Sequence, residues 1–231
     1  MSPLALISVS DKTNIIPFCK DLVEKYGFKI LSSGGTAKHL IEANVPVIKV
    51  ADFTKSPEIL DGRVKTLHPK IHGGILAKRT NDKHQKEIEV NKFELIDLVV
   101  VNLYPFKKKV EEQCSWEEAI ENIDIGGPSM IRSAAKNHSD VAVLVDPNQY
   151  KDYIEEIKKG PLNKEFKTKL AFEAFQHTAS YDNAISNWMS KEKELMPSNF
   201  IESFPLIKQL RYGENPHQKA LWYGSNEIGW N

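Results

Sequence analysis

The chain has 231 residues, which is enough for one sizeable hydrophobic core or for one domain with an appendage. Its 31 lysine and arginine residues balance its 31 aspartate and glutamate residues, so no global field would attract a nucleic acid or an anionic membrane. No stretch approaches the roughly 20 apolar residues that span a bilayer, and the first ten residues lack the pattern of a signal peptide; we expect a soluble, cytoplasmic protein.

Short apolar strands alternate with helical patterns in the first part of the chain. The expected elements are, in order, a strand at 4–9, a helix that Thr13 caps and Gly27 ends, a strand at 28–33, a short helix at 36–44 and a strand at 45–50. A long irregular region follows, and it contains the basic stretch DGRVKTLHPKIHGG at 61–74.

The later part contains two further strands and then becomes helical. The expected elements are, in order, a strand at 96–104, a short helix with a capping box of Ser115 and Glu118, a helix from Pro128 to about Lys136, a strand at 141–146 and a helical segment from Asn163 to Met189. This alternation predicts an α/β fold of three layers, in which helices flank both faces of a parallel sheet and a helical extension follows.

Segments with polar residues lie at or directly after the carboxyl ends of three of the predicted strands. They are Ser10–Lys12 after the first strand, Ser33–Thr36 after the second, and Asn102–Tyr104 at the end of the fourth. In an open parallel sheet the carboxyl ends of the strands share one edge, and ligands bind in the crevice there. We therefore expect these segments to meet around one ligand.

The segment Ser33-Gly34-Gly35-Thr36 has the composition of an anion-binding turn. Glycine lets the backbone approach a ligand closely, and the hydroxyl groups and the first amides of the next helix donate hydrogen bonds. An ordinary turn before a helix is the alternative. Because the glycine patterns for dinucleotides and triphosphates are absent, we expect a single phosphate on a nucleotide monophosphate or a sugar phosphate.

The basic stretch at 61–74 suits a small anionic ligand because the charge is local. His68 and His72 are spaced to share one helical face, but Pro69 would have to open that helix and no third ligand has a typical spacing. We therefore predict no metal site.

The stretch at 123–137 carries charged groups on either side of a Gly-Gly-Pro turn. Asp124 precedes the turn, and Lys136 lies in the helix that follows. A helix-start carboxylate and a helix-end cation are the structural alternatives for these two residues, and a part in a reaction is the functional one.

Together these stretches resemble one family, the IMP cyclohydrolase domain of the bifunctional purine-biosynthesis enzyme AICAR formyltransferase/IMP cyclohydrolase. The resemblance rests on SVSDK (8–12), SSGGTAKHL (32–40), GRVKTLHPKIHGGIL (62–76), VVVNLYPF (99–106) and IDIGGPSMIRSAAKNH (123–138). It covers roughly residues 4–190 and continues into RYGENPHQ at 211–218. It implies a methylglyoxal-synthase-like fold and a homodimer. It also implies ring closure of 5-formamidoimidazole-4-carboxamide ribonucleotide (FAICAR) to inosine monophosphate (IMP) with loss of water, without a metal or an organic cofactor.

The resemblance also implies roles for individual residues. The implied catalytic residues are Lys65, Tyr104, Asp124 and Lys136. The implied substrate-binding residues are Ser10, Asp11, Lys12, Ser33, Gly34, Gly35, Thr36, Arg63, Val64, Thr66, Val101, Asn102, Ile125, Gly126 and Gly127. We expect Asp124 and Lys136 to relay protons at the carboxamide, and Lys65 and Tyr104 to hold the formyl oxygen.

The chain departs from the family in its length. We expect residues 1–190 to form the cyclohydrolase domain, and 191–231 to be a linker with the beginning of a truncated formyltransferase domain. Arg211 and Tyr212 would contact AICAR there in the full-length enzyme, with 10-formyltetrahydrofolate as co-substrate, and we expect no formyltransferase activity from this chain alone. The alternatives are a regulatory ligand-binding module of the same fold, as in carbamoyl phosphate synthetases, and methylglyoxal synthase itself.

Overall fold

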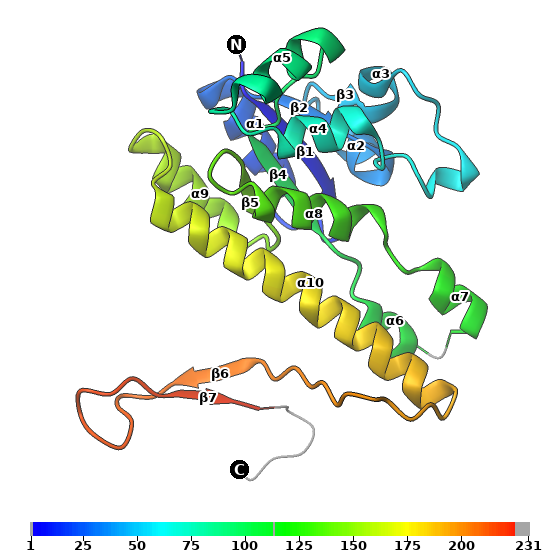
Figure 1. Ribbon diagram of the computed structural model, residues 1–231, viewed down its shortest axis with the longest axis vertical. Coiled ribbons are helices and arrows are strands. Elements are labelled where there is room, and N and C mark those ends of the chain that lie inside the picture. Colours follow the sequence, from blue (N-terminus) through cyan, green and yellow to red (C-terminus); the bar gives the residue numbers. More distant parts are fainter. Residues whose placement is uncertain (1, 113, 225–231) are drawn as a thin grey trace. The chain divides into compact units, whose positions relative to one another are not determined.

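The computed structural model describes residues 2–112 and 114–224. The chain divides into two compact units, Met1–Tyr181 and Asp182–Asn231, and the division falls within the long helix α10 (Lys164–Glu192). The other helices are α1 (Ile15–Tyr26), α2 (Gly34–Glu42), α3 (Val50–Thr54), α4 (Pro69–Leu76), α5 (Asp82–Asn91), α6 (Phe106–Glu111), α7 (Trp116–Glu121), α8 (Gly126–Lys136) and α9 (Gln149–Lys158), with a 3₁₀ turn at Leu60–Gly62 (Figure 1).

The first unit is built on a parallel sheet. In the described part of the chain its strands are β1 (Leu4–Val9), β2 (Lys29–Ser32), β3 (Ile48–Lys49), β4 (Leu98–Asn102) and β5 (Ala142–Leu144). They lie in the order β3-β2-β1-β4-β5, and every neighbouring pair is parallel. Because β1 and β4 are central and covered on both faces, nearly all of their residues are buried, as their continuous apolar sequences predict.

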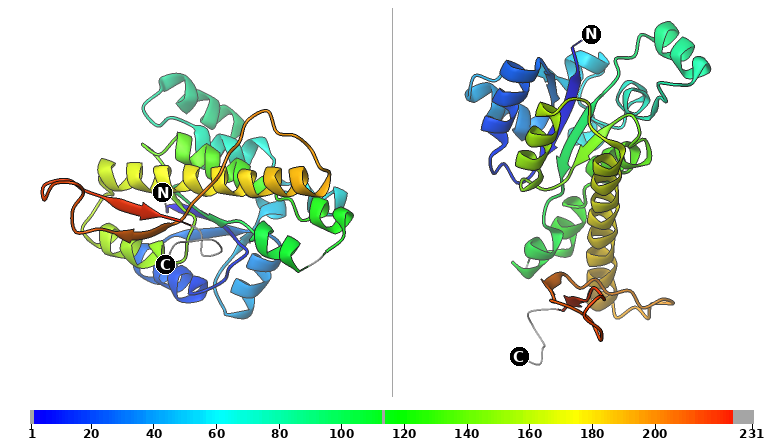
Figure 2. Two further views of the ribbon diagram at one scale, coloured as in Figure 1. Left: turned by 90° about the horizontal axis from the view of Figure 1, so that it is seen from below. Right: turned by 90° about the vertical axis from the view of Figure 1, so that its left-hand side faces the viewer.

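Helices cover both faces of this sheet (Figure 2). On one face α1 packs beside α9, and the ring of Phe18 stacks on that of Tyr150 with centroids 4.4 Å apart. On the other face α8 lies against β4 and β5 and packs on α4, while the guanidinium of Arg132 lies 5.7 Å from the ring centre of Phe175 on α10. This three-layer arrangement confirms the fold class predicted from the sequence.

Several helix boundaries differ from the prediction. The first helix begins at Ile15 after Asn14 in the left-handed conformation, because the amide of Thr13 donates to the side chain of Asp11 and Thr13 does not cap the helix. Gly27 ends that helix as expected, with a φ of 67°. The helix expected at Pro128 starts two residues earlier, at Gly126.

The long region expected to be irregular contains α4 and α5, and most of α3 falls within it as well. Pro69 opens α4, and the side chain of His68 caps it by accepting a hydrogen bond from the amide of Lys70 at 3.1 Å. Buried Ile71 and Ile75 supply an apolar face that the surrounding charges hide in the sequence. The expected strand at 45–50 shrinks to Ile48–Lys49, because Val50 already belongs to α3.

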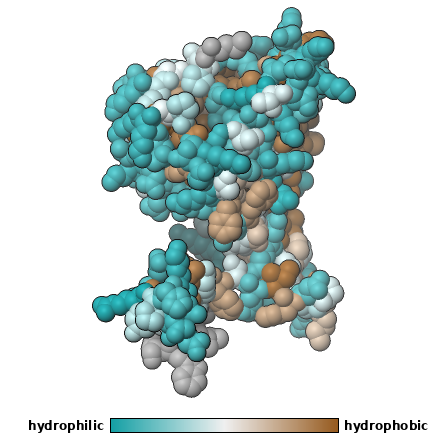
Figure 3. Space-filling model, turned by 60° about the vertical axis from the view of Figure 1, so that its left-hand side comes forward, coloured by the Kyte–Doolittle hydropathy of each residue, from teal (hydrophilic) through white to brown (hydrophobic). Residues whose placement is uncertain are grey.

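The second unit contains a short antiparallel pair that the sequence analysis missed. The strands β6 (Leu206–Gln209) and β7 (Leu221–Tyr223) pair across a connection that contains Gly213 and Pro216. All residues of both strands are exposed, including apolar ones such as Trp222. Hydrophilic residues predominate on the face of the molecule drawn in Figure 3, with hydrophobic residues among them. Within the described ranges, no helix has the length and apolar character needed to cross a membrane.

Candidate functional site

At the carboxyl edge of the sheet, the side chain of Asn102 joins the end of β4 to the loop that follows β1. Its carbonyl oxygen accepts the amides of Ser10 at 2.7 Å and Asp11 at 2.8 Å, and its amide nitrogen donates to the carbonyl of Asp11 at 3.0 Å. Asn102 is 8% exposed. The two segments therefore meet as expected, and Asn102 holds the β1–α1 loop through its side chain. Lys12 lies exposed on that loop.

The turn between β2 and α2 is tied to the same edge. The hydroxyl of Thr36 accepts the amide of Val9 and donates to the carbonyl of Val9, both at 3.0 Å, so these contacts connect it to β1. The hydroxyl oxygen of Ser33 is buried and has no hydrogen-bond partner. A buried hydroxyl without a partner is costly unless a ligand satisfies it, and Ser33 is therefore the strongest candidate for a ligand-binding group in the turn.

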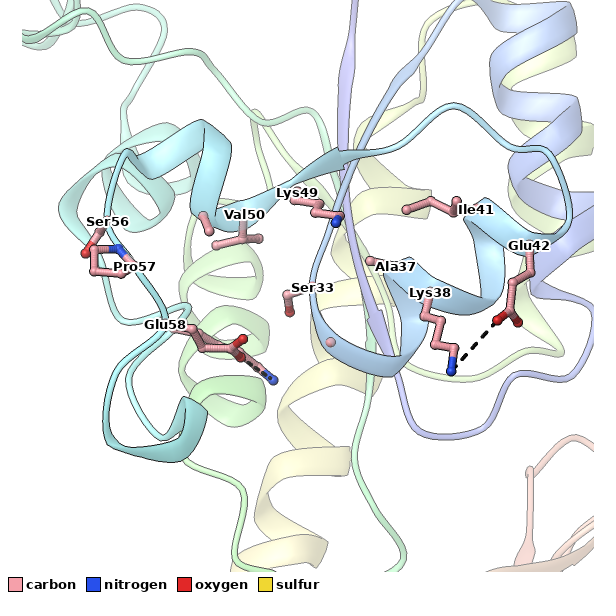
Figure 4. Close-up of a pocket in the computed structure, with 13 residues that line it drawn as sticks. Ser33, Ala37, Lys38, Ile41, Glu42, Lys49, Val50, Ser56, Pro57 and Glu58 are labelled. Carbon is pink, nitrogen blue, oxygen red and sulfur yellow. Dashed lines mark ion pairs between the residues drawn. The ribbon is translucent and has the colours of Figure 1, made fainter.

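A pocket of about 540 Å³ opens beside this turn. Its wall includes Ser33, Gly34 and Ala37 from the turn and α2, and Glu58 and Lys65 from the segment after α3 (Figure 4). Gly34 has a φ of 54°, and a side-chain carbon at this position would lie 3.0 Å from the Nζ of Lys65. Glycine thus gives the backbone the left-handed conformation and lets the ammonium come close to the turn.

Two cations of the basic stretch, Arg63 and Lys65, are paired with carboxylates. The Nζ of Lys65 lies 3.4 Å from Oε1 of Glu58, and Figure 4 marks this ion pair with a dashed line. The guanidinium of Arg63 binds Glu121 through two nitrogen atoms, with the Nε at 3.2 Å from Oε1. This contact lowers the pKa of Glu121 and raises that of Arg63, so both stay charged. An anionic ligand would compete with Glu58 for Lys65.

Asp124 lies at the start of α8, next to the basic stretch. Its carboxylate accepts the amide of Gly127 at 2.9 Å, which is the helix-start role foreseen as the structural alternative. Gly126 faces Thr66, since a side-chain carbon on Gly126 would lie 2.4 Å from the hydroxyl oxygen of Thr66. The stretch that carries Lys65 and the turn that carries Asp124 are therefore packed against each other.

The segment after β4 carries Tyr104. Tyr104 is 39% exposed, whereas Leu103 beside it is buried. A side-chain carbon on Gly127 would lie 2.7 Å from Cδ2 of Leu103, so this segment also contacts the start of α8. Val101 is buried within β4, Val64 is partly buried, and Ile125 is exposed at 58%.

Lys136 lies away from the other residues of the implied catalytic set. It is exposed at the end of α8, and the 11 residues of this helix rise by roughly 15 Å from its start near Asp124. It lines a second pocket of about 650 Å³ together with Phe172 and Phe175 of α10. Within one chain the structure therefore brings Lys65, Tyr104 and Asp124 to one region and leaves Lys136 in another.

Two further pairs of residues were singled out in the sequence. Arg211 and Tyr212 belong to the second unit and are exposed. His68 and His72 do not form a cluster, because His68 caps α4 and the Nδ1 of His72 bonds the hydroxyl of Ser133 at 3.0 Å. Among the residues that the structure describes, no group of three or more histidine, cysteine, aspartate or glutamate side chains is placed to hold a metal ion.

Two residues of α10 contact the site, although no motif in the sequence marks them as functional. The Nε2 of His177 accepts the amide of Leu103 at 3.3 Å, and the hydroxyl of Tyr181 accepts the amide of Asp124 at 2.8 Å. Only the spacing of four residues between them indicates a shared face.

The chain is similar to known proteins over its whole length. The family described as MGS-like domain matches residues 14–129, and that described as AICARFT/IMPCHase bienzyme matches residues 134–230. The chain is 87% identical to the bifunctional purine biosynthesis protein PurH of Prochlorococcus marinus strain MIT 9515, and 57% identical to the protein of that name from strain NATL1A. Both matches cover 100% of this chain and 45% of the relative, so the chain spans less than half of their length.

A solved structure supports the same assignment. The protein described as the crystal structure of ForH is 32% identical, with a TM-score of 0.69, and the match covers 82% of this chain and 100% of that one. The resemblance found in the sequence is therefore confirmed: the chain belongs to the family of MGS-like domains and corresponds to the N-terminal, MGS-like region of the bifunctional PurH proteins.

Proposed function

We propose that this chain is an IMP cyclohydrolase, which closes FAICAR to IMP with loss of water. The observation that carries the proposal is the unpartnered Ser33 hydroxyl beside the Lys65 ammonium at a Gly-Gly turn. This arrangement suits one phosphate or a polarised oxygen, and the purine-biosynthesis names of the relatives supply the substrate class. Residues 1–190 would form the catalytic domain, and 191–231 would begin the formyltransferase domain.

The reaction joins two groups of one substrate. The carboxamide nitrogen attacks the formyl carbon and loses one proton, and the formyl oxygen becomes a hydroxyl. The hydroxyl then takes up a second proton and leaves as water, while the formamido nitrogen loses its proton and a carbon–nitrogen double bond replaces the broken carbon–oxygen bond. Holding the two groups in contact supplies much of the rate, because the step is intramolecular. The enzyme must then accept two protons from nitrogen, stabilise the developing oxyanion, and return two protons to the departing oxygen.

The site offers groups for these tasks. Asp124 would accept the proton of the carboxamide nitrogen, because its carboxylate lies at the start of α8 beside the basic stretch. Lys65 and Tyr104 would donate hydrogen bonds to the formyl oxygen. The loop at Ser10–Lys12, the turn at Ser33–Thr36 and Arg63 would bind the remainder of the nucleotide. Such an oxyanion donor typically contributes about 2.7–4 kcal/mol.

The position of Lys136 suggests a homodimer. If Lys136 takes part in the reaction, the length of α8 prevents it from reaching Asp124 of its own chain, and a second copy would have to supply it. Mixing Lys65→Ala chains with Lys136→Ala chains tests this, because mixed dimers would regain one intact site and about a quarter of the parent activity. A mixture as inactive as its components would exclude the shared site.

The function is tested by incubating the protein with FAICAR and recording the growth of IMP absorbance. We expect turnover in the parent and a loss of about 10²–10³-fold in Lys65→Ala and in Asp124→Asn. Lys108→Ala serves as a control, because Lys108 is exposed on α6 and should leave the rate unchanged. Tight binding of IMP without turnover would refute the enzyme and support a regulatory binding module. We propose no cofactor for this step and a cytoplasmic location.

A further inference from the structure

Helix α10 contacts residues on both sides of Tyr104. His177 accepts the amide of Leu103, the residue before Tyr104, at 3.3 Å. The ring of Tyr181 lies edge-on to the ring of Phe106, with centroids 6.4 Å apart. Phe106 is 1% exposed and begins α6 two residues after Tyr104. The segment between β4 and α6 is therefore anchored at each end by residues of one helix.

The same helix contacts the backbone at the start of α8. The hydroxyl of Tyr181 accepts the amide of Asp124 at 2.8 Å, and Tyr181 is 7% exposed. The carboxylate of Asp124 accepts the amide of Gly127, so the backbone and the side chain of Asp124 are both held. The segment after β4 and the segment before α8 are thus bonded to side chains four residues apart on α10.

These two side chains accept hydrogen bonds from backbone amides that lie outside regular helices and strands. The strand β4 ends at Asn102, and the next helix begins only at Phe106, so the amide of Leu103 lies between elements. A buried amide without an acceptor is unfavourable. Without this hydrogen bond the loop could also adopt other conformations. The imidazole must be neutral to accept this bond, and burial lowers the pKa of His177, against the opposing charge of Asp146.

We propose that His177 and Tyr181 are positioning residues for the proposed cyclohydrolase reaction, because their side chains fix the backbone that carries Tyr104 and Asp124. The inference rests on the proposed function for its kinetic consequence. The substrate would contact Tyr104 and Asp124, and α10 would act only through them. A displacement of about 1 Å at such groups can cost roughly 10²-fold in rate.

The first test needs no substrate. Amide hydrogen exchange, measured by NMR on the whole chain, should show strong protection of Leu103 and Asp124 in the parent. Tyr181→Phe should remove the protection of Asp124, and His177→Phe that of Leu103, while Gln176→Ala on the exposed side of α10 leaves both protected. Exchange of both amides in the parent at the rate of an exposed loop would overturn the proposal.

The second test is the kinetics with FAICAR. We expect kcat to fall by about 10- to 100-fold in His177→Phe and in Tyr181→Phe, with KM changed by less than about 3-fold. His177→Gln keeps an acceptor at the Nε2 position and should restore kcat to within about 3-fold of the parent. Equal kcat in His177→Phe and Gln176→Ala would overturn the positioning role. An inactive parent with protected amides would refute the proposed function and leave the anchoring by α10 in place.

Discussion

The side chain of Asn102 should be a main stabiliser of the sheet edge at which the site is built. Asn102→Ala removes an acceptor from the amides of Ser10 and Asp11 and a donor from the carbonyl of Asp11. The same contacts join the ends of the two central strands, β1 and β4. Their loss should therefore lower both the stability of the first unit and its affinity for a nucleotide.

The magnitude follows from the three hydrogen bonds. Each contributes roughly 0.5–1.5 kcal/mol to the free energy of unfolding, which gives about 1.5–4.5 kcal/mol for the set. Ser10 is partly exposed and Asp11 is exposed, so water can replace part of what their amides lose. We therefore expect the lower half of that range, about 2 kcal/mol.

The assay is urea unfolding followed by far-UV circular dichroism. The midpoint should fall while the slope with urea stays constant, because the surface exposed on unfolding is the same. Asn91→Ala is the matched control, since Asn91 is an exposed helix residue with one hydrogen bond, and it should change the free energy by less than about 0.5 kcal/mol. An equal midpoint in the Asn102 variant and the control would refute the reasoning.

Three further perturbations should separate ligand binding from stability. Glu58→Gln frees the ammonium of Lys65 and should tighten IMP binding by about 1.5- to 5-fold in calorimetry at low salt; unchanged or weaker binding would contradict this. Ser33→Ala removes a buried hydroxyl without a partner, so it should leave the urea midpoint unlowered but weaken IMP binding by about 10-fold or more. A lower midpoint would show that the hydroxyl already has a hydrogen-bond partner within the protein. Burial lowers the pKa of His72, so below pH ~6.5 the unfolded chain binds more protons than the folded chain, and the free energy of unfolding should fall as the pH falls to about 5. The variant His72→Asn keeps a polar group near the position of Nδ1 and should show a smaller fall. An identical pH dependence in this variant and the parent would exclude His72 as a cause.

The sheet was predictable because its signal is local. Apolar runs such as LALISV must be buried on both faces, and the helical patterns between them force parallel connections. The capping box of Ser115 and Glu118 and the end of α1 at Gly27 were equally readable, since each depends on residues within one turn. In contrast, α4 was missed because its apolar face is only Ile71 and Ile75, among charged neighbours.

The sequence by itself determined which polar segments lie at the carboxyl edge of the sheet, because strand direction and order place them there. It did not determine what each polar side chain bonds. Thr36 and Asn102 suit a ligand equally well in the sequence, yet the structure uses their hydrogen bonds to join β1 to its neighbours and leaves Ser33 without a partner. Hydrogen bonds between residues more than 25 positions apart depend on the packed geometry, and no local pattern encodes them.

The tertiary structure also decided which residues support the site and which stand apart. His177 and Tyr181 reach the site because α10 packs across it, although they are far from the motifs in sequence. Lys136 follows Asp124 by only 12 positions, yet a rigid helix holds the two roughly 15 Å apart. Proximity along the chain indicates contact only when the intervening backbone can turn back, and an α-helix cannot.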